Sequence, residues 1–306
     1  MWGRDLYVRF LLFGGVGFVG VNLARHLAAR GHDVVLAKRR GIPPRPLIAR
    51  ALSGLKVMEY SDPAELIEST NPDVVVNLVA ALHGTREEIR RANAEFPSLL
   101  CDAARRAGWR NRVVHISAAT VVGLGASREE DAHLDGVRPA TYFDQTKAEG
   151  EQAIARCFED WVIVRPTAIY GPYNDHPEWA ALVRAARAGI APSLKLSFSA
   201  ISSSDLSAVV ERSASLAPPR QYFFATECKP LEFELVVDAL EEAAGRRLAR
   251  IPLPLALARL LAPSGVRGLL KYAGTPYSCE KMRRAVGYEA TYRKSDMVEM
   301  FRLLWS

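Results

Sequence analysis

The sequence predicts an α/β fold in which a parallel, doubly wound sheet carries helices on both faces. Three observations support this prediction. A glycine-rich turn joins the first apolar run to a helical pattern, and apolar runs then alternate with helical patterns as far as residue 171. The run 73–81 is apolar on both faces. Such a strand belongs in the middle of a parallel sheet.

The glycine-rich turn lies within residues 8–20, which read VRFLLFGGVGFVG. Gly14 and Gly17 let the backbone turn sharply and approach a ligand, and Gly20 lets the next helix pack close to the strand. The free N–H groups at the start of that helix suit a pyrophosphate. We therefore expect a bound dinucleotide here, the alternative being an ordinary strand-to-helix turn. The residues of the turn expected to contact it are Gly14, Gly15, Val16, Gly17, Phe18 and Val19.

Basic residues follow the second predicted strand, 33–37. A site for NAD usually has Asp or Glu here to accept hydrogen bonds from the ribose, whereas the 2′-phosphate of NADP needs cations. The sequence has Lys38, Arg39 and Arg40, which favours NADP(H) over NAD(H), although a solvated basic turn would look the same. After a third strand at 55–60, Glu59 is expected either near the adenine or in solvent.

The carboxyl ends of the strands should carry the chemistry, because ligands of such sheets bind there. Small residues at the end of run 73–81 would let a cofactor lie against the backbone, and the contacts expected there are Val79, Ala80 and Ala81. Asn93 lies in a predicted helix, 87–107, either as a hydrogen-bonded core residue or as one that orders the active-site strands, and it is counted among the expected cofactor-site residues. Further strands are predicted at 112–117, 161–166 and 221–226.

The alternation of strand and helix changes beyond residue 172. We expect a strand at 194–201, a helix capped by Ser204 and Asp205, and helices at 179–188, 231–245, 253–262 and 296–304. Residues 1–171, with a return segment at about 195–228, would form the dinucleotide-binding domain. A smaller, mostly helical C-terminal cap for the substrate would comprise 172–194 and 229–306. The apolar stretch 253–270 is a lid or core helix, or touches a membrane surface.

Composition and charge limit the kinds of ligand and the cellular location that we expect for this protein. The net charge of +6 over 306 residues comes from dispersed arginines without interleaved aromatics, so we expect a small anionic ligand and no nucleic acid. Charged residues near the N-terminus argue against a signal peptide, and no apolar run is long enough to span a bilayer, so a cytoplasmic location is expected. The histidines show no metal-binding spacing. The cysteines are expected to be reduced thiols, and they are Cys101, Cys157, Cys228 and Cys279.

Several motifs in order resemble the extended short-chain dehydrogenase/reductase family, which includes epimerases, dehydratases and 3β-hydroxysteroid dehydrogenase-like enzymes. The motifs are Gly14-x-x-Gly17-x-x-Gly20 and the segments 73–81, 117–123, 146–149, 165–172 and 279–288. The resemblance covers nearly the whole chain. It implies a Rossmann-type fold, a bound nicotinamide cofactor and hydride transfer to or from a substrate carbon. It also implies cofactor contacts from Lys147, Pro166, Thr167, Ala168 and Ile169.

The resemblance fails at the catalytic hydroxyls, so the active site is atypical. The family has Tyr four residues before Lys147, where this chain has Phe143. Tyr142 is one residue away, roughly 100° around a helix, and would need a distorted helix start to take the role. The family's Ser or Thr, five residues before Gly123, is Ala118. The catalytic candidates are therefore Lys147, Tyr142, Thr120 and Ser117.

Three functions remain open. The first is an NADP(H)-dependent oxidoreductase acting on a carbonyl, imine or alcohol of a small, lipophilic or polycyclic metabolite. The second is a redox-silent relative: an isomerase, lyase or cyclase with a structural nucleotide, or a cofactor-binding interaction protein. The third is a nucleotide-sugar epimerase or dehydratase. We allow for a homodimer, and the expected substrate contacts are His83, Phe143, Tyr173 and His176.

Overall fold

The computed structural model describes residues 7–123, 134–261 and 273–306. Its centre is a seven-stranded sheet with the order β11-β6-β5-β4-β1-β2-β3, in which every neighbouring pair is parallel. The predicted doubly wound parallel sheet is therefore confirmed. The strands are β1 (Arg9–Phe13), β2 (Asp33–Arg39), β3 (Lys56–Tyr60), β4 (Val74–Asn77), β5 (Arg112–Ile116), β6 (Trp161–Pro166) and β11 (Gln221–Ala225).

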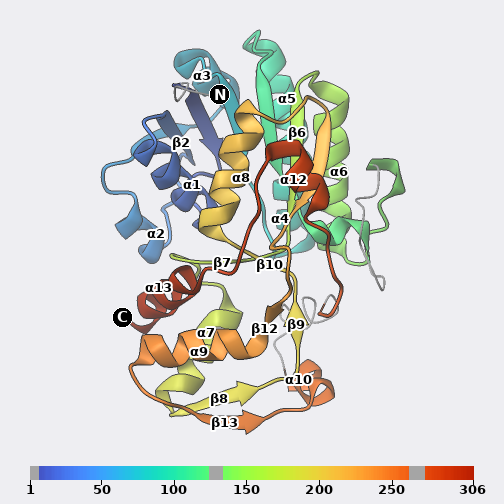
Figure 1. The fold of residues 1–306 in the computed structure, drawn as a ribbon. Helices are drawn as coiled ribbons and strands as arrows, with labels where there is room; N and C mark the ends of the chain where they lie inside the picture. Colours follow the sequence, from blue (N-terminus) through green and yellow to red (C-terminus); the bar gives the residue numbers. More distant parts are fainter. Residues whose placement is uncertain (1–6, 124–133, 262–272) are drawn as a thin grey trace.

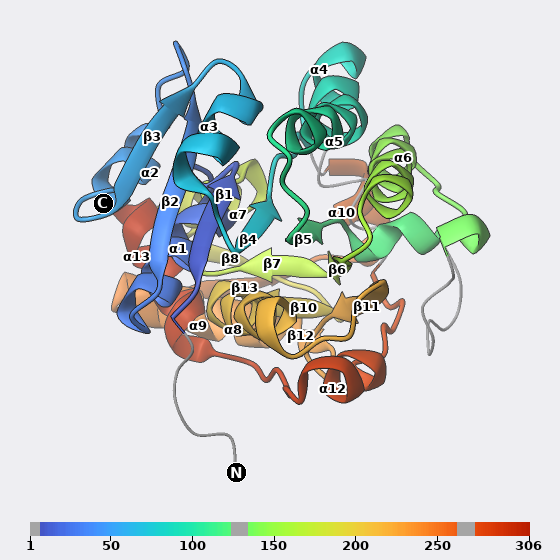
Figure 2. The same ribbon diagram turned by 90° about the horizontal axis from the view of Figure 1, so that it is seen from above.

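Helices cover both faces of the sheet because its central strands are apolar on both sides (Figures 1 and 2). In β1, Leu12 packs with Leu23 and Leu27 on one face, while Leu11 packs with Leu100 on the other. The first face carries α1 (Phe18–Ala29), α8 (Ser203–Ser215) and α12 (Glu280–Val286). The second face carries α3 (Pro63–Thr70), α5 (Phe96–Arg106) and α6 (Tyr142–Cys157), and the short α2 (Pro46–Ala51) follows β2.

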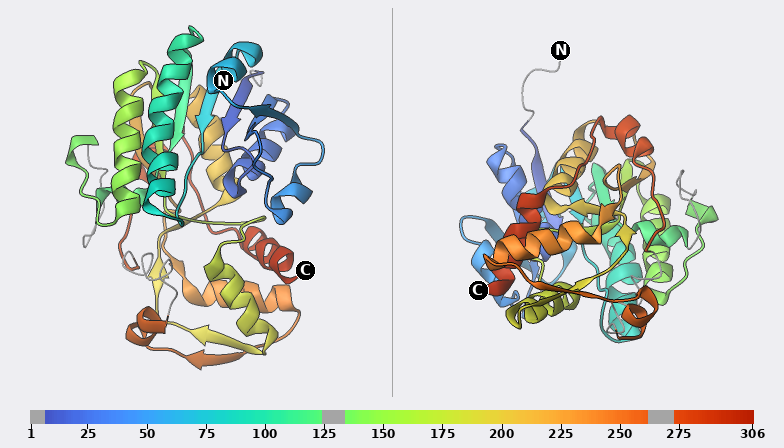
Figure 3. Two further views of the ribbon diagram at one scale, coloured as in Figure 1. Left: turned by 180° about the vertical axis from the view of Figure 1, so that it is seen from behind. Right: turned by 60° about the horizontal axis from the view of Figure 1, so that its bottom comes forward.

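A smaller C-terminal region lies beneath the carboxyl edge of the sheet, as Figure 3 shows from behind and below. Its core joins α7 (Pro177–Arg187), α9 (Phe233–Ala244) and α13 (Lys294–Trp305) through Trp179, Leu240 and Phe301. Paired short strands complete it: β8 (Ile190–Ser193) with β13 (Ala249–Pro252), and β9 (Ser197–Phe198) with β12 (Leu231–Glu232). The pair β7 (Ala168–Tyr170) and β10 (Ala200–Ser202) joins the two regions, and α10 (Leu255–Leu261) follows β13.

Two elements have boundaries that differ from the predicted ones, the end of β4 and the start of α8. A side-chain hydrogen bond lies at each of these boundaries. β4 stops at Asn77 instead of reaching residue 81, because the Asn77 Oδ1 accepts a hydrogen bond from the Val79 N–H at 3.1 Å and turns the chain out of the sheet. The cap of α8 is Ser202, whose Oγ accepts from the Asp205 N–H at 2.9 Å, so the prediction of Ser204 and Asp205 as caps was wrong. The strand expected at 194–201 is divided between β9 and β10.

The helix predicted at 87–107 is interrupted. It comprises α4 (Arg86–Arg90), a π-helical turn η1 (Arg91–Glu95) and α5. Pro97 has no N–H to continue the regular i→i−4 ladder, which explains the wider turn just before it. Asn93 lies inside η1 and is fully buried.

Two cysteines form a disulfide, so the expectation of four reduced thiols was wrong. Cys228, after β11, is bonded to Cys279, at the start of α12, with 5.2 Å between their Cα atoms. They are 51 residues apart, and sequence spacing does not show that α12 packs beside β11. Cys101 and Cys157 are free thiols.

Two segments discussed from the sequence contain residues that the structure does not describe. Residues 124–133, between the segments 117–123 and 146–149 of the family resemblance, and residues 262–272, which continue the apolar stretch 253–270, lie outside the described residues. No helix among the described residues is long and apolar enough to cross a membrane.

A buried ion pair joins α6 to β6. The Nε and Nη2 atoms of Arg165 donate to the two carboxylate oxygens of Glu151 at 2.9 and 2.7 Å, and both residues are at most 1% exposed. The Arg165 guanidinium also stacks on Tyr222 at 4.9 Å. Two parallel hydrogen bonds fix the rotation of α6 against the sheet.

We expect Glu151→Gln to lower the free energy of unfolding by about 3 kcal/mol, because it leaves the Arg165 charge buried beside a neutral amide. Urea unfolding monitored by circular dichroism measures this loss. Glu149→Gln on the same helix is the control, since Glu149 pairs with the exposed Arg90 and should matter far less. Equal losses in both variants would contradict the assignment.

Lys147 lies one turn before Glu151 on α6 and is 1% exposed. Its Nζ donates a hydrogen bond to the Ile116 carbonyl at 2.7 Å. Burial lowers the pKa of Lys147 to about 8, and the nearby Glu151 charge acts in the opposite direction. The amine can therefore lose its proton only a little above neutral pH.

This shift makes stability depend on pH. Between about pH 8 and the ordinary lysine pKa of 10.5, the unfolded chain binds more protons than the folded one, so the free energy of unfolding rises with pH. The difference in unfolding free energy between parent and Lys147→Met should therefore grow in the parent's favour by about 1 kcal/mol per pH unit up to about pH 10. Urea unfolding at several pH values tests this, and a pH-independent difference would refute it.

Candidate functional site

The glycine turn packs tightly against the end of β4. Gly14 has a φ of +79°, and a Cβ atom there would lie 2.7 Å from the Leu78 carbonyl carbon. A Cβ on Gly20 would lie 2.5 Å from the Gly15 oxygen, so α1 sits directly on the turn. Gly17 is the N-cap of α1 and a Cβ there would meet only the Gly14 oxygen, at 3.2 Å. The turn is closed toward the sheet and open at the amino end of α1.

The amino end of α1 offers backbone donors. In the described part of the chain no side chain caps it, and its first turn contains no acidic residue. Uncapped N–H groups and the helix dipole together make this end suited to an anion.

Lys38, Arg39 and Arg40 differ in their environment at the end of β2. Lys38 Nζ donates to Glu59 Oε1 at 2.5 Å across β2 and β3, and this contact lowers the pKa of Glu59. Arg39 and Arg40 are exposed and form no ion pair within the described part of the chain. Of the predicted cations, the two arginines are therefore the ones available to a ligand.

Asn93 connects the loop after β4 to α6. Its Oδ1 accepts from the Ala81 N–H at 3.0 Å, and its Nδ2 donates to the Ala81 carbonyl at 3.0 Å and to Thr146 Oγ1 at 3.2 Å. A Cβ on Gly150 would lie 2.2 Å from the Asn93 carbonyl oxygen, so α6 and η1 touch backbone to backbone. Of the two interpretations of Asn93, the contacts favour the one in which it orders this edge of the sheet.

Three of the catalytic candidates gather at the end of β5. Lys147 donates to the Ile116 carbonyl, and the next residue, Ser117, has a buried Oγ with no hydrogen-bond partner among the described residues. Thr120 Oγ1 donates to the carboxylate of Asp144. The sequence analysis did not single out Asp144, although the Thr141-x-x-Asp144 capping box at the start of α6 is visible in the sequence.

Tyr142 lies apart from this group. It is the first residue of α6, and its ring lies under the guanidinium of Arg86 at 4.7 Å, on the side of α4. The capping box starts α6 regularly, without the distortion that would turn Tyr142 toward the family's position. Phe143, which has no proton to donate, is half-buried in that position.

Two residues that are expected to contact the substrate lie next to each other. The rings of His83, after β4, and His176, at the start of α7, have centroids 6.0 Å apart. Burial lowers the pKa of His176, which favours the neutral imidazole. Glu178 joins them, and the ligand atoms of all three lie within 4.8 Å of one another. The histidine spacing gave no sign of this, because 83 and 176 are brought together only by the fold.

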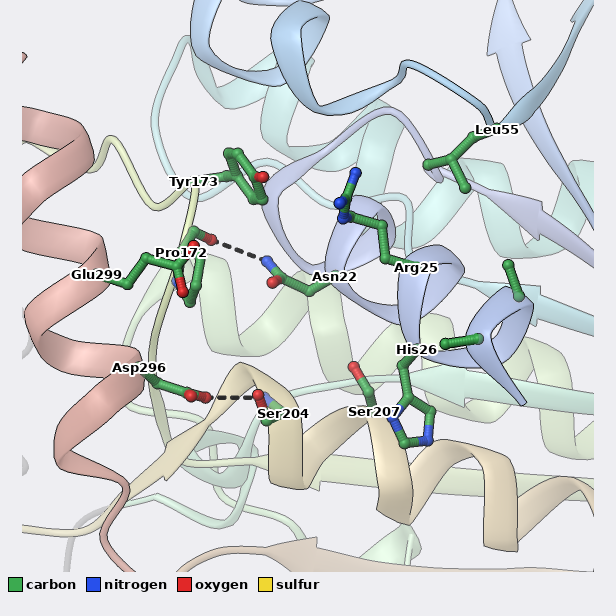
Figure 4. A pocket seen from close by; sticks show the side chains of 12 residues that line it. Asn22, Arg25, His26, Leu55, Pro172, Tyr173, Ser204, Ser207, Asp296 and Glu299 are labelled. Atoms are coloured by element: carbon green, nitrogen blue, oxygen red, sulfur yellow. Dashed lines mark hydrogen bonds between the residues drawn. The ribbon is translucent and has the colours of Figure 1, made fainter. Parts of the chain in front are cut away.

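A separate pocket of about 560 Å³ lies between α1, α8 and α13 (Figure 4). Asn22 Nδ2 donates to the Pro172 carbonyl at 2.8 Å beside it, and the Ser204 N–H donates to Asp296 at 3.3 Å. Tyr173 is the one expected site residue among those lining it in the described structure. This pocket is therefore distinct from the glycine turn and from the end of β5.

Known proteins resemble the chain in sequence. Residues 10–198 match the model of the NAD dependent epimerase/dehydratase family. Sterol demethylase protein B of Methylococcus capsulatus is 32% identical over 182 residues, covering 55% of this chain and 53% of that protein. This chain thus spans about half the length of that curated relative. A 4-hydroxy-2-methyl-3-oxo-4-farnesyl-3,4-dihydroquinoline-1-oxide ketoreductase of Stigmatella aurantiaca is 24% identical over 92% of both chains.

The fold is also found among solved structures. UDP-glucuronic acid 4-epimerase from Bacillus cereus, in complex with NAD, superimposes with a TM-score of 0.76 over 97% of this chain and 98% of that one. At 17% identity, this likeness concerns the fold alone. The family model covers most of the sheet and its helices. The chain therefore belongs to the NAD-dependent epimerase/dehydratase family, within the extended short-chain dehydrogenases/reductases.

Proposed function

We propose that the chain is an NADP(H)-dependent oxidoreductase that acts on a carbonyl, imine or alcohol of a small, lipophilic or polycyclic metabolite. The observation that carries this proposal is the open glycine turn at an uncapped helix end, with Lys147 buried beside the end of β5. The names of two relatives, a sterol demethylase protein and a farnesyl-dihydroquinoline ketoreductase, support a lipophilic, ring-containing substrate. Residues 172–194 and 229–306 would cover this substrate as a cap.

The residues present fit a dinucleotide. Gly14 lets the turn lie against the backbone after β4, Gly17 leaves open space at the amino end of α1, and the first N–H groups of α1 would hold the pyrophosphate. When bound, the nicotinamide supplies or accepts a hydride. Arg39 and Arg40 would hold a 2′-phosphate, since both are exposed cations and no acid ends β2. Asn93 would keep the Ala81 backbone in place beside the cofactor.

Reduction of a carbonyl or imine also needs a proton donor. Lys147 would bind the ribose, and the hydroxyls available at the end of β5 are those of Ser117 and Thr120. Tyr142 would have to leave its contact with Arg86 to act as the acid. A substrate that is already activated, such as an iminium or conjugated carbonyl, would need no such donor.

A second function is favoured by one observation. Phe143 and Ala118 replace the family's hydroxyls while the ring of Tyr142 is held at Arg86. This combination would suit a redox-silent enzyme, an isomerase, lyase or cyclase that keeps its nucleotide as a structural group.

The cofactor can be tested by binding. Arg39→Ala combined with Arg40→Ala should weaken NADPH binding by about ten-fold or more and leave NADH binding nearly unchanged, because only the 2′-phosphate loses its partners. Gly17→Ala should weaken both, since its methyl group would stand at the amino end of α1. Titration calorimetry measures these affinities, with the exposed Arg50→Ala as charge control. Tighter binding of NADH than NADPH by the parent would overturn the preference.

The reaction can be tested by turnover. We expect the parent to oxidise NADPH with members of a carbonyl and imine panel, and Phe143→Tyr to raise the rate on unactivated ketones by about 100-fold, because it restores a phenol four residues before Lys147. Tyr142→Phe shows whether the native phenol takes part. NADPH binding without oxidation, together with a product of unchanged oxidation state, would instead establish the redox-silent function.

A further inference from the structure

Three side chains of kinds that commonly bind metal ions lie close together, although they come from two regions of the fold. His83 lies in the loop between β4 and α4, His176 is the N-cap of α7, and Glu178 is in the first turn of α7. Their ligand atoms lie within 4.8 Å of one another. The group therefore joins the dinucleotide-binding region to the start of the C-terminal region.

The backbone that carries two of these residues is fixed. The buried Asn174 accepts from the His176 N–H at 3.2 Å and donates to the Ile169 carbonyl at 3.1 Å. Pro177 is the first residue of α7 and restricts the backbone between His176 and Glu178. Neighbouring Asp175 is engaged elsewhere, in an ion pair with Arg45. The convergence therefore follows from ordered local structure.

No hydrogen-bond or ion-pair partner among the described residues explains why these three side chains lie together. Within the described ranges, the imidazoles of His83 and His176 and the carboxylate of Glu178 form no hydrogen bond or ion pair. His176 and Glu178 are half-buried and His83 is exposed, and a bound ion would be a shared partner that accounts for the convergence of their ligand atoms. Arg45 adds a positive charge nearby, but Asp175 compensates it.

We propose that His83, His176 and Glu178 bind a divalent transition-metal ion of the zinc class. Two imidazole nitrogens and one carboxylate oxygen are a donor set that zinc accepts, and small rotations of the side chains would bring them to coordination distance. Three protein ligands leave a fourth position for water or for an oxygen of a substrate. His83 follows Ala81, whose backbone Asn93 holds, by two residues, so the ion would lie near the edge where Phe143 and Ala118 supply no hydroxyl.

The test uses the full chain, stripped with a chelator and dialysed against zinc chloride without cofactor, so that its result does not depend on the proposed redox activity. We expect one zinc per chain by elemental analysis, and visible d–d absorption of the bound ion when cobalt(II) replaces zinc. His83→Ala, His176→Ala and Glu178→Gln should each weaken zinc binding by at least about ten-fold. His83 is exposed, so its variant should fold normally.

Matched controls separate this site from others. Glu234→Gln changes an exposed carboxylate in the first turn of another helix, α9, and should leave zinc binding unchanged. His26→Ala removes a histidine that contacts Glu211, which also contacts His32. Absence of zinc binding by the parent, or binding that survives His83→Ala and Glu178→Gln but is lost in His26→Ala, would overturn the proposal.

Discussion

The arrangement of this molecule depends on one steric constraint, the contact between the turn after β1 and the backbone that leaves β4. Gly14 can lie there only because it has no Cβ, and Gly20 brings α1 onto the same turn. These contacts aim the first N–H groups of α1 away from the sheet and toward the edge where β4 and β5 end. A larger residue at either glycine would move the helix and the β4 loop together.

Three further interactions fix the part of the same sheet edge where β4, β5 and β6 end. Asn93 fixes the loop after β4, Lys147 reaches the end of β5, and Glu151 anchors α6 to Arg165 of β6. All three interactions involve α6 or the turn that packs against it, so one helix positions Lys147 and, through Asp144, contacts Thr120. The departures from the family at Phe143 and Ala118 therefore change the chemistry available without loosening this support.

Local pattern predicted much of the structure. The glycine spacing at 14, 17 and 20 and the apolar run after Asp73 are short-range signals, and they predicted the sheet and its central strand correctly, although that strand ends at Asn77 and not at residue 81. The disulfide between Cys228 and Cys279 and the meeting of His83 with His176 are contacts between distant segments, which spacing along the chain does not encode. The orientation of Tyr142 also escaped prediction, because it depends on Arg86 in another helix.

The disulfide has a consequence for the smaller region. Cys228 and Cys279, separated by 51 positions in the sequence, close a covalent ring that contains α9, β13 and α10. In a chain-entropy model, a ring of that length disfavours the unfolded chain by about 4 kcal/mol. In a thiol-rich environment that contribution would vanish, and this half of the cap would depend on its apolar packing against α7 and α13 and on the pairing of β12 with β9 and of β13 with β8.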